Sequence, residues 1–238
     1  MDKLGRLLAL TAIAAAGSAS AAPVLVNSAA ALGANDSVNW SQLGSDGTAL
    51  NQNFTANSAN SVVVSGAFAG AGGGCLAVVG GSNCGWNAGP GFNGGDSVLW
   101  AEDGNYSGSG PLTLSFASAL GAGLWVQATA SGAYSMSIEA FNGASSLGAF
   151  SESSNANGDG LFIGVLDTLA DITSIKLTLT ACSAGCDFAV NSLQLAEAAA
   201  NAVPEPSSWM LVVLPLMSLP FFRRRQAGAT PVNMGNCA

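Results

Sequence analysis

Short apolar runs, separated by breaks rich in Gly, Ser, Asn and Asp, fill the middle of this 238-residue chain. The clearest runs, 112–116 and 134–140, alternate apolar and polar side chains, as a strand with one buried face does. Further runs that we assign to strands are 37–43, 61–65, 97–100, 124–128, 161–166, 172–179 and 188–195. Only 28–34 and 197–201 are compatible with a helix. Roughly nine or ten short strands predict an all-β fold, an antiparallel sandwich or barrel, and we favour a jelly-roll-like β-sandwich.

The first 21 residues have the layout of a secretory signal peptide. Two basic residues precede an apolar run at 7–16, and Ala19 and Ala21 form a small-x-small cleavage site. We therefore expect residues 1–21 to be removed and the rest of the chain to be exported.

The other end of the chain carries a second delivery signal. Three features follow one another: the box Val203-Pro204-Glu205-Pro206, an uncharged run at 207–222, and the cluster Arg223-Arg224-Arg225. The run has roughly 16 residues, a little short of the about 20 that cross a bilayer comfortably, and the arginines mark its cytoplasmic side. We expect a transmembrane helix there.

These two signals divide the chain into predicted segments. They are a signal peptide at 1–21, a β-sandwich ectodomain at 22–196, a linker with the Pro-Glu-Pro box at 197–206, a transmembrane sorting helix at 207–222, and a basic cluster with a cytoplasmic tail at 223–238. The ectodomain is long enough for one all-β domain with its own core.

The order of box, apolar run and arginines resembles the PEP-CTERM sorting signal of Gram-negative, exopolysaccharide-producing bacteria. The resemblance implies an exosortase, an integral-membrane cysteine transpeptidase-like enzyme, as the processing partner. It also implies a location at the inner membrane, followed by the cell surface or extracellular matrix after processing. The family usually ends near the arginines, whereas residues 226–238 continue this chain. An ordinary single-pass anchor that is never processed is the alternative.

The body of the chain resembles the β-sandwich ectodomains that PEP-CTERM proteins often carry. The residues that suggest it include 94–99, 110–116, 162–165 and 187–193. Such ectodomains look like carbohydrate-binding and discoidin-type jelly rolls, but this resemblance names no ligand.

The charge of the chain excludes several partners and reactions. Lys176 is the single basic side chain of 22–196, and the net charge of the whole chain is −8. Nucleic acids and anionic membrane surfaces attract proteins through basic patches, so we expect neither as a partner of the ectodomain. The chain contains no histidine, which removes Ser-His-Asp and Cys-His catalysis and histidine zinc sites.

Carboxylates are the remaining catalytic candidates. A glycoside hydrolase needs two of them about 5–10 Å apart across a cleft. The candidates are Asp96, Glu102, Asp103, Glu139 and Asp187. The simpler interpretation is that these acids lie on solvated loops and keep the protein soluble. We therefore predict no enzymatic activity and no cofactor, with a carboxylate-based glycoside hydrolase as an alternative.

One string of residues has the first half of a calcium-binding loop. Asn155, Asn157 and Asp159 place side-chain oxygens at alternate positions, but position twelve of such a loop is Leu166 rather than Glu. The same residues form a turn without a metal, because they tolerate positive φ. We predict a turn, with calcium as the alternative. A calcium site at Asp46 or Asp187 would rest on analogy with jelly rolls alone.

Cysteines of an exported protein usually pair. Cys75 and Cys84 lie in a Gly-rich stretch, and Cys182 and Cys186 lie between the last two predicted strands. Four cysteines allow three connectivities, and locality favours Cys75 with Cys84 and Cys182 with Cys186. A metal or redox site at 182–186 is the alternative. The fifth cysteine lies beyond the arginines, on the predicted cytoplasmic side.

Aromatic residues in loops supply a candidate carbohydrate site. Trp86 and Phe92 lie near the Gly-rich stretch, and Tyr106 lies in a Gly-Asn-Tyr-Ser-Gly turn, where exposed rings could stack on sugars. Packing beside the disulfide is the alternative for Trp86. Three other tryptophans lie in predicted strands and are assigned to the core: Trp40, Trp100 and Trp125.

These patterns favour an exported, non-enzymatic protein of the cell envelope or extracellular matrix. We expect a structural role in association with exopolysaccharide or biofilm, because both chain ends are delivery signals and the middle is poor in catalytic groups. A carbohydrate-binding module is the first alternative.

Overall fold

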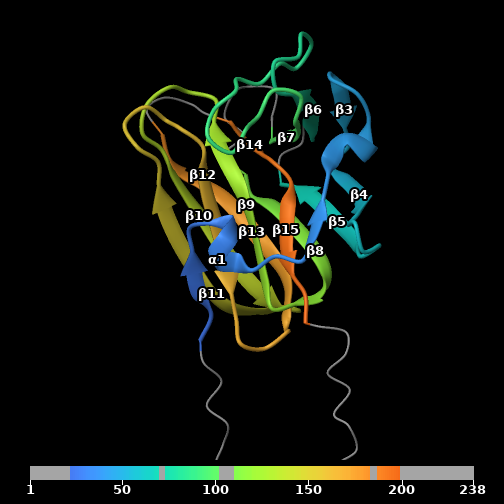
Figure 1. The fold of residues 1–238 in the computed structure, drawn as a ribbon, viewed down its shortest axis with the longest axis vertical. Coiled ribbons are helices and arrows are strands. Elements are labelled where there is room, and N and C mark those ends of the chain that lie inside the picture. Colours follow the sequence, from blue (N-terminus) through green and yellow to red (C-terminus); the bar gives the residue numbers. More distant parts are fainter. Residues whose placement is uncertain (1–21, 70–72, 102–109, 183–186, 199–238) are drawn as a thin grey trace, which may run out of the picture. The chain divides into compact units, whose positions relative to one another are not determined.

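The computed structural model describes residues 22–69, 73–101, 110–182 and 187–198, which form two antiparallel β-sheets (Figure 1). The first sheet has nine strands: β1 (Val24–Val26), β2 (Asp36–Val38), β3 (Thr48–Leu50), β6 (Gly74–Val78), β7 (Ser97–Ala101), β9 (Gly121–Ala128), β12 (Leu161–Leu166), β14 (Phe188–Val190) and β15 (Leu193–Ala196). The second has six: β4 (Asn53–Asn57), β5 (Val63–Phe68), β8 (Leu112–Ala119), β10 (Ser135–Asn142), β11 (Ser145–Ser153) and β13 (Ile172–Ala181). A short helix, α1 (Ala29–Leu32), and a 3₁₀ turn, η1 (Trp40–Leu43), lie between the first strands.

The nine-stranded sheet forks beside β9. Its main order is β1-β12-β9-β14-β7-β6-β3, and β15 also pairs with β9 and with β2. β14 pairs with the second half of β9, from Val126, whereas β15 pairs with the first half, up to Gly123. Asn191 and Ser192 lie between β14 and β15, at the point where the sheet divides. The six-stranded order is β11-β10-β13-β8-β5-β4.

One face of each sheet contributes to a shared core. Leu124 and Val126 of β9 belong to the same buried cluster as Leu114 of β8 and Ile138 of β10. Because strand side chains alternate between the two faces, these residues place one face of each sheet inside. The two sheets therefore pack as a β-sandwich, and burial of this apolar surface is its main stabilising term.

Two smaller clusters cover the outer face of the nine-stranded sheet. α1 packs against β9, β12 and β15, where Leu32 joins Phe162 in one cluster. Residues 79–96 return over the same face and place Trp86 and Phe92 against outward side chains of β6, β7 and β14. Trp125 of β9 contacts both clusters. The outer face of this sheet is therefore largely covered rather than open to solvent.

The first and last strands meet at one end of the nine-stranded sheet. Four strands are aligned at this end: Val24 of β1 pairs with Leu166 of β12, and Leu166 pairs with Gly121 of β9. Gly121 pairs in turn with Ala196 of β15. Gln127 lies six residues further along β9, which is about 20 Å at the usual rise per strand residue. Side chains near Gln127 are therefore remote from the points where the described chain begins and ends.

The prediction of an all-β fold with antiparallel sheets is confirmed, and most predicted runs fall in strands. The single strand predicted over 37–43 is wrong, because Asn39 accepts a hydrogen bond from the Ser41 N–H at 2.8 Å and starts η1. The run 188–195 is two strands rather than one, because the sheet forks at Asn191. Of the two segments compatible with helix, 28–34 contains α1, capped by Ser28 and Gly33. Residues 197 and 198 are not helical, and 199–201 lie outside the described residues.

The strands absent from the predictions are β1, β3, β4, β6 and β11. β6 lies in the Gly-rich stretch, and its apolar run at 75–79 was missed because the glycines on both sides suggested a loop. β11 is serine-rich, and its place comes from a ladder with β10 rather than from apolar alternation.

The chain divides into two units, residues 1–198 and 199–238. The predicted end of the ectodomain, residue 196, coincides with the last residue of β15. The signal peptide at 1–21 and the sorting signal from Val203 to Arg225 lie outside the described residues.

Candidate functional site

A disulfide and one carboxylate fix the loop that returns over the outer face. Cys75 of β6 is bonded to Cys84, as predicted. Asp46 accepts hydrogen bonds from the backbone N–H groups of Val78, Ser82, Asn83 and Cys84 at 2.9–3.3 Å. The bonds from the Asn83 and Val78 N–H groups are the main reason why the pKa of the Asp46 carboxyl is below its ordinary value of 3.8. The loop is thus held by one covalent bond and one ionised acceptor.

This loop packs two aromatic rings against the sheet. Trp86 is 7% exposed and Phe92 is 1% exposed. The Trp86 ring lies 5.7 Å from the Trp100 ring in an edge arrangement and 6.4 Å from the Phe92 ring, measured between centroids. Both geometries are favourable for aromatic pairs. Trp86 therefore packs beside the disulfide, which was the alternative prediction. Neither Trp86 nor Phe92 has the exposed ring that the carbohydrate-site prediction required.

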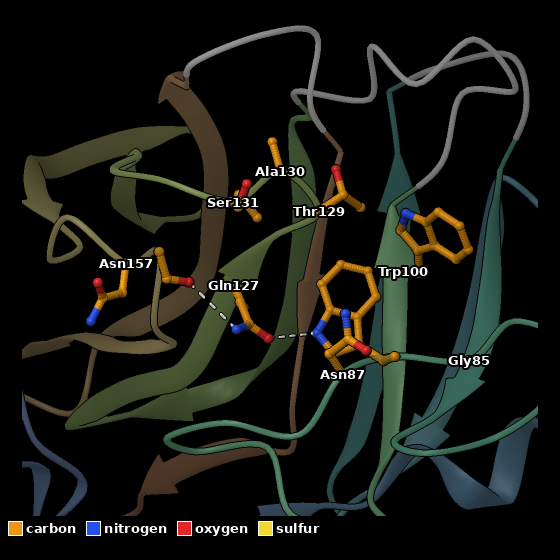
Figure 2. A pocket seen from close by; sticks show the side chains of 11 residues that line it. Gly85, Asn87, Trp100, Gln127, Thr129, Ala130, Ser131 and Asn157 are labelled. Carbon is orange, nitrogen blue, oxygen red and sulfur yellow. Dashed lines mark hydrogen bonds between the residues drawn. The ribbon is translucent and has the colours of Figure 1, made fainter.

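A hollow of about 280 Å³ opens beside these rings, and we call it the indole hollow (Figure 2). Its walls include Trp86, Trp100, Asn87, Gln127, Thr129 and Asn157. Gln127 lies between Asn157 on one side and Trp100 on the other (Figure 2). Its Oε1 accepts a hydrogen bond from the Trp86 indole N–H at 2.7 Å, and its Nε2 donates to the Gly158 carbonyl at 3.4 Å. Gln127 thus joins the two walls of the hollow.

The calcium-like string forms one of these walls as a hydrogen-bonded turn. The Asn155 Oδ1 accepts from the backbone N–H groups of Asn157 and Asp159 at 3.1 and 3.2 Å, and the Asn155 Nδ2 donates to Asp159 Oδ2 at 2.6 Å. The Tyr134 hydroxyl lies 3.0 Å from the Asp159 carbonyl and 2.8 Å from the Val126 carbonyl, which ties the turn to β9. Burial raises the pKa of Tyr134, so the hydroxyl stays a donor. Within the described residues, no group of three acidic or cysteine side chains has the arrangement of a metal site.

The tryptophans assigned to the core divide between two environments. Trp40 is fully buried, and its indole N–H donates to the Asn191 carbonyl at 3.0 Å. Trp100 and Trp125 instead point to the outer face of the nine-stranded sheet and are partly exposed. The core assignment of Trp100 and Trp125 is therefore wrong, because their neighbours Leu99 and Leu124 take the inward positions.

The candidate catalytic carboxylates in the described residues lie apart. Asp96 is on the outer side of the nine-stranded sheet. Glu139 is on the six-stranded sheet in an ion pair with Lys176, whose hydrogen bond lowers the pKa of Glu139. Asp187 is fully buried. No two carboxylates of the described chain line the indole hollow.

Other predicted residues fall outside the described part of the chain. They are Tyr106, Glu102, Asp103 and Cys186. Cys182 is itself disulfide-bonded.

Of the polar walls of the indole hollow, the sequence predictions named only Asn157, as part of a turn, although a signal for Gln127 was available. In the run 124–128, Gln127 has the same parity as Trp125, so a polar residue marks the outward face on which Trp125 also lies. Asn87 and Asn157 come from distant loops, and nothing in their local sequence joins them to β9.

Comparisons with family models, curated proteins and solved structures found no match to this chain. In the part of the chain that the structure describes, no helix has the length and apolar character needed to cross a bilayer.

Proposed function

We propose that this chain is an exported, non-enzymatic protein of the cell envelope or extracellular matrix that binds a neutral polysaccharide at the indole hollow. One observation carries the proposal: the residues that line the hollow are uncharged, and they combine indole rings with carboxamides and hydroxyls.

That combination fits a sugar better than other small ligands. Indole rings offer apolar faces to the C–H groups of a sugar ring, while Asn and Gln side chains both donate to and accept from hydroxyls. An anionic polymer would have to approach a chain of net charge −8 without a basic residue at the hollow. A neutral polyhydroxylated ligand is not repelled by the negative charge and needs no basic residue at the hollow.

The delivery signals give this binding site a place to act. We propose that the terminal signals export the chain, that an exosortase-like enzyme processes the Pro-Glu-Pro box, and that the sandwich is jelly-roll-like. The indole hollow lies near the end of β9 opposite Ala196, after which the chain continues toward the sorting signal.

Intact masses of the protein from the membrane and medium fractions test this delivery. We expect the chain to lack residues 1–21 in both fractions, and the medium form also to lack everything after the Pro-Glu-Pro box. A full-length, uncut chain among cytosolic proteins would refute export.

Binding is tested with variants of the hollow and neutral polysaccharide from the matrix of the producing cells. We expect Trp100→Ala to weaken binding by about tenfold or more, because aromatic anchors dominate such interfaces. Asn87→Ala and Asn157→Ala should each weaken it by about three- to tenfold, because each loses a hydrogen bond of about 1 kcal/mol. Isothermal titration calorimetry measures the affinities.

Two controls separate binding from folding. Asn87 and Asn157 are exposed, so their variants should keep the thermal midpoint of the wild-type protein. Thr113→Ala, on the outer face of the six-stranded sheet, should leave affinity unchanged. If the polysaccharide does not bind the wild-type protein, or binds folded hollow variants equally well, the proposed function is wrong.

A further inference from the structure

A second hollow, of about 570 Å³, lies on the same outer face of the nine-stranded sheet. Its walls include Asn93, Asp96, Trp125, Asn191 and Gln194, and we call it the polar hollow. Its lining residues come from four separate parts of the chain: α1 with η1, the 91–97 loop, β9, and the fork between β14 and β15. Carboxamide and hydroxyl groups dominate this lining, as they do beside the rings of the indole hollow.

Asn191, at the fork of the sheet, fixes the walls of this hollow through its hydrogen bonds. Its Nδ2 donates to the Gly91 carbonyl at 2.6 Å and to Asp96 Oδ2 at 2.8 Å, while its Oδ1 accepts from the Ser192 N–H at 2.7 Å. Its backbone N–H donates to the Trp125 carbonyl at 2.9 Å. One side chain therefore joins the sheet to the loop that carries Asp96, and it holds the walls in place.

The two hollows are neighbours along β9. Trp125 lines the polar hollow and Gln127 lines the indole hollow. These two residues point to the same face of one strand, so their Cα atoms are about 7 Å apart. That separation is small enough for one extended ligand to reach both.

A tight turn packs close to both Trp125 and Gln127, where the two hollows approach each other. Gly89 and Phe92 exchange backbone hydrogen bonds of 2.9 Å, which leaves Pro90 and Gly91 at the tip. Gly91 has φ of 75°, and a Cβ atom there would lie 2.1 Å from Cδ2 of Trp125. Gly91 thus lies directly on the Trp125 ring, and the absence of a side chain lets the turn pack closely against the sheet.

We propose that the indole hollow and the polar hollow are consecutive subsites of one track, which binds an internal stretch of a polysaccharide chain. This inference rests on the proposed function, and it specifies the ligand as a polymer segment rather than a single sugar or a chain end. Both hollows are open to the same face, and neither contains a basic group that would select an anionic unit.

The polar hollow adds a strong acceptor to the track. Asp96 is its one charged lining residue. The Asp96 Oδ2 atom accepts from the Asn93 N–H at 2.8 Å as well as from Asn191. A carboxylate offers about four acceptor sites, so Asp96 keeps capacity for sugar hydroxyls, and such charge-assisted hydrogen bonds are stronger than neutral ones.

The test is a length series of oligomers prepared from the neutral matrix polysaccharide, from about two to ten sugars, with affinity measured by calorimetry on the full chain. For the wild-type protein, we expect the Kd to fall by about tenfold or more as oligomers become long enough to fill both hollows, a gain of about 1.4 kcal/mol. The double variant Asn93→Ala/Gln194→Ala should bind the shortest oligomers as the wild-type protein does and lose most of that gain.

The outcomes separate the two proposals. A wild-type Kd that does not change with length, or a double variant that keeps the full gain, overturns the track. Loss of binding after the reducing ends of the polymer are converted to alditols also overturns it, because an internal stretch would be unaffected. If no oligomer or polymer binds the wild-type protein, the proposed function itself fails. Thr113→Ala, on the other sheet, is the matched control and should reproduce the wild-type length series.

Discussion

Replacing Trp86 with alanine is expected to lower the free energy of unfolding by about 3–5 kcal/mol, the usual cost of removing a large buried aromatic side chain. The indole is 7% exposed, contacts the rings of Trp100 and Phe92, and donates a hydrogen bond to Gln127. Its loss leaves a cavity between the returning loop and the sheet and removes the indole N–H that donates to Gln127. Urea denaturation followed by the fluorescence of the remaining tryptophans measures the change.

Trp86→Phe is the matched control for this prediction. Phenylalanine keeps part of the ring packing but loses the indole N–H and some ring area, so we expect the free energy of unfolding to fall by about 1–2 kcal/mol. A Trp86→Ala variant as stable as the wild-type protein would show that the loop does not depend on this ring. The same comparison matters for ligand studies, because weak polysaccharide binding by Trp86→Ala would reflect a disturbed loop as much as a lost contact.

The strands that alternate regularly were predictable from sequence. In β8, Leu112, Leu114 and Phe116 are buried while Thr113 and Ser115 point outward. That pattern arises because the outer face of the six-stranded sheet faces solvent. In the nine-stranded sheet, α1 and residues 79–96 cover the outer face, so both faces of the sheet are apolar. The sequence of β12 is therefore an unbroken apolar run, which does not indicate which of its side chains point inward.

Because of this ambiguity, the sequence predictions placed Trp100 and Trp125 on the wrong face of the sheet. Val98 and Leu99 are both fully buried, one under the returning loop and one in the sandwich core. Apolarity alone therefore could not place Trp100 on either face. For Trp125, which was assigned to the core, the polar neighbour of equal parity, Gln127, would have indicated the correct face, because a glutamine is rarely placed in a sandwich core.

The candidate site could not be assembled from sequence because its parts meet only through the fold. Asn87 comes from the disulfide-bonded loop region, Gln127 from β9, and Asn157 from the turn before β12. The cysteine pairing was predictable from locality and placed the loop beside β6. The direction in which that loop returns depends on Asp46, more than thirty residues earlier in the chain, whose four backbone partners no local pattern indicates.

The disulfide and Asp46 therefore stabilise the same loop, so removing the disulfide should make the contribution of Asp46 measurable. Replacing both Cys75 and Cys84 with alanine is expected to lower the free energy of unfolding by about 2–3 kcal/mol, because the bond closes a loop between residues nine positions apart. The order of residues 78–84 then rests on the hydrogen bonds that Asp46 accepts. Chemical denaturation at neutral pH measures the first effect.

Acid should then loosen this loop in the double variant before it affects the wild-type protein. The folded pKa of Asp46 is depressed below 3.8, so its contribution is complete above the unfolded pKa of about 3.9 and is lost as the pH falls through the lower folded value. Hydrogen exchange of the Ser82 and Asn83 amides, corrected for intrinsic rates, should therefore lose protection below about pH 4 in the variant. Adding Asp46→Asn to the double variant should reduce that protection already at neutral pH and remove its dependence on acid. Equal protection of the loop in the wild-type protein and the cysteine variant at every pH would mean that the disulfide does not order it. Unchanged protection after the Asp46→Asn substitution would mean that Asp46 does not order it.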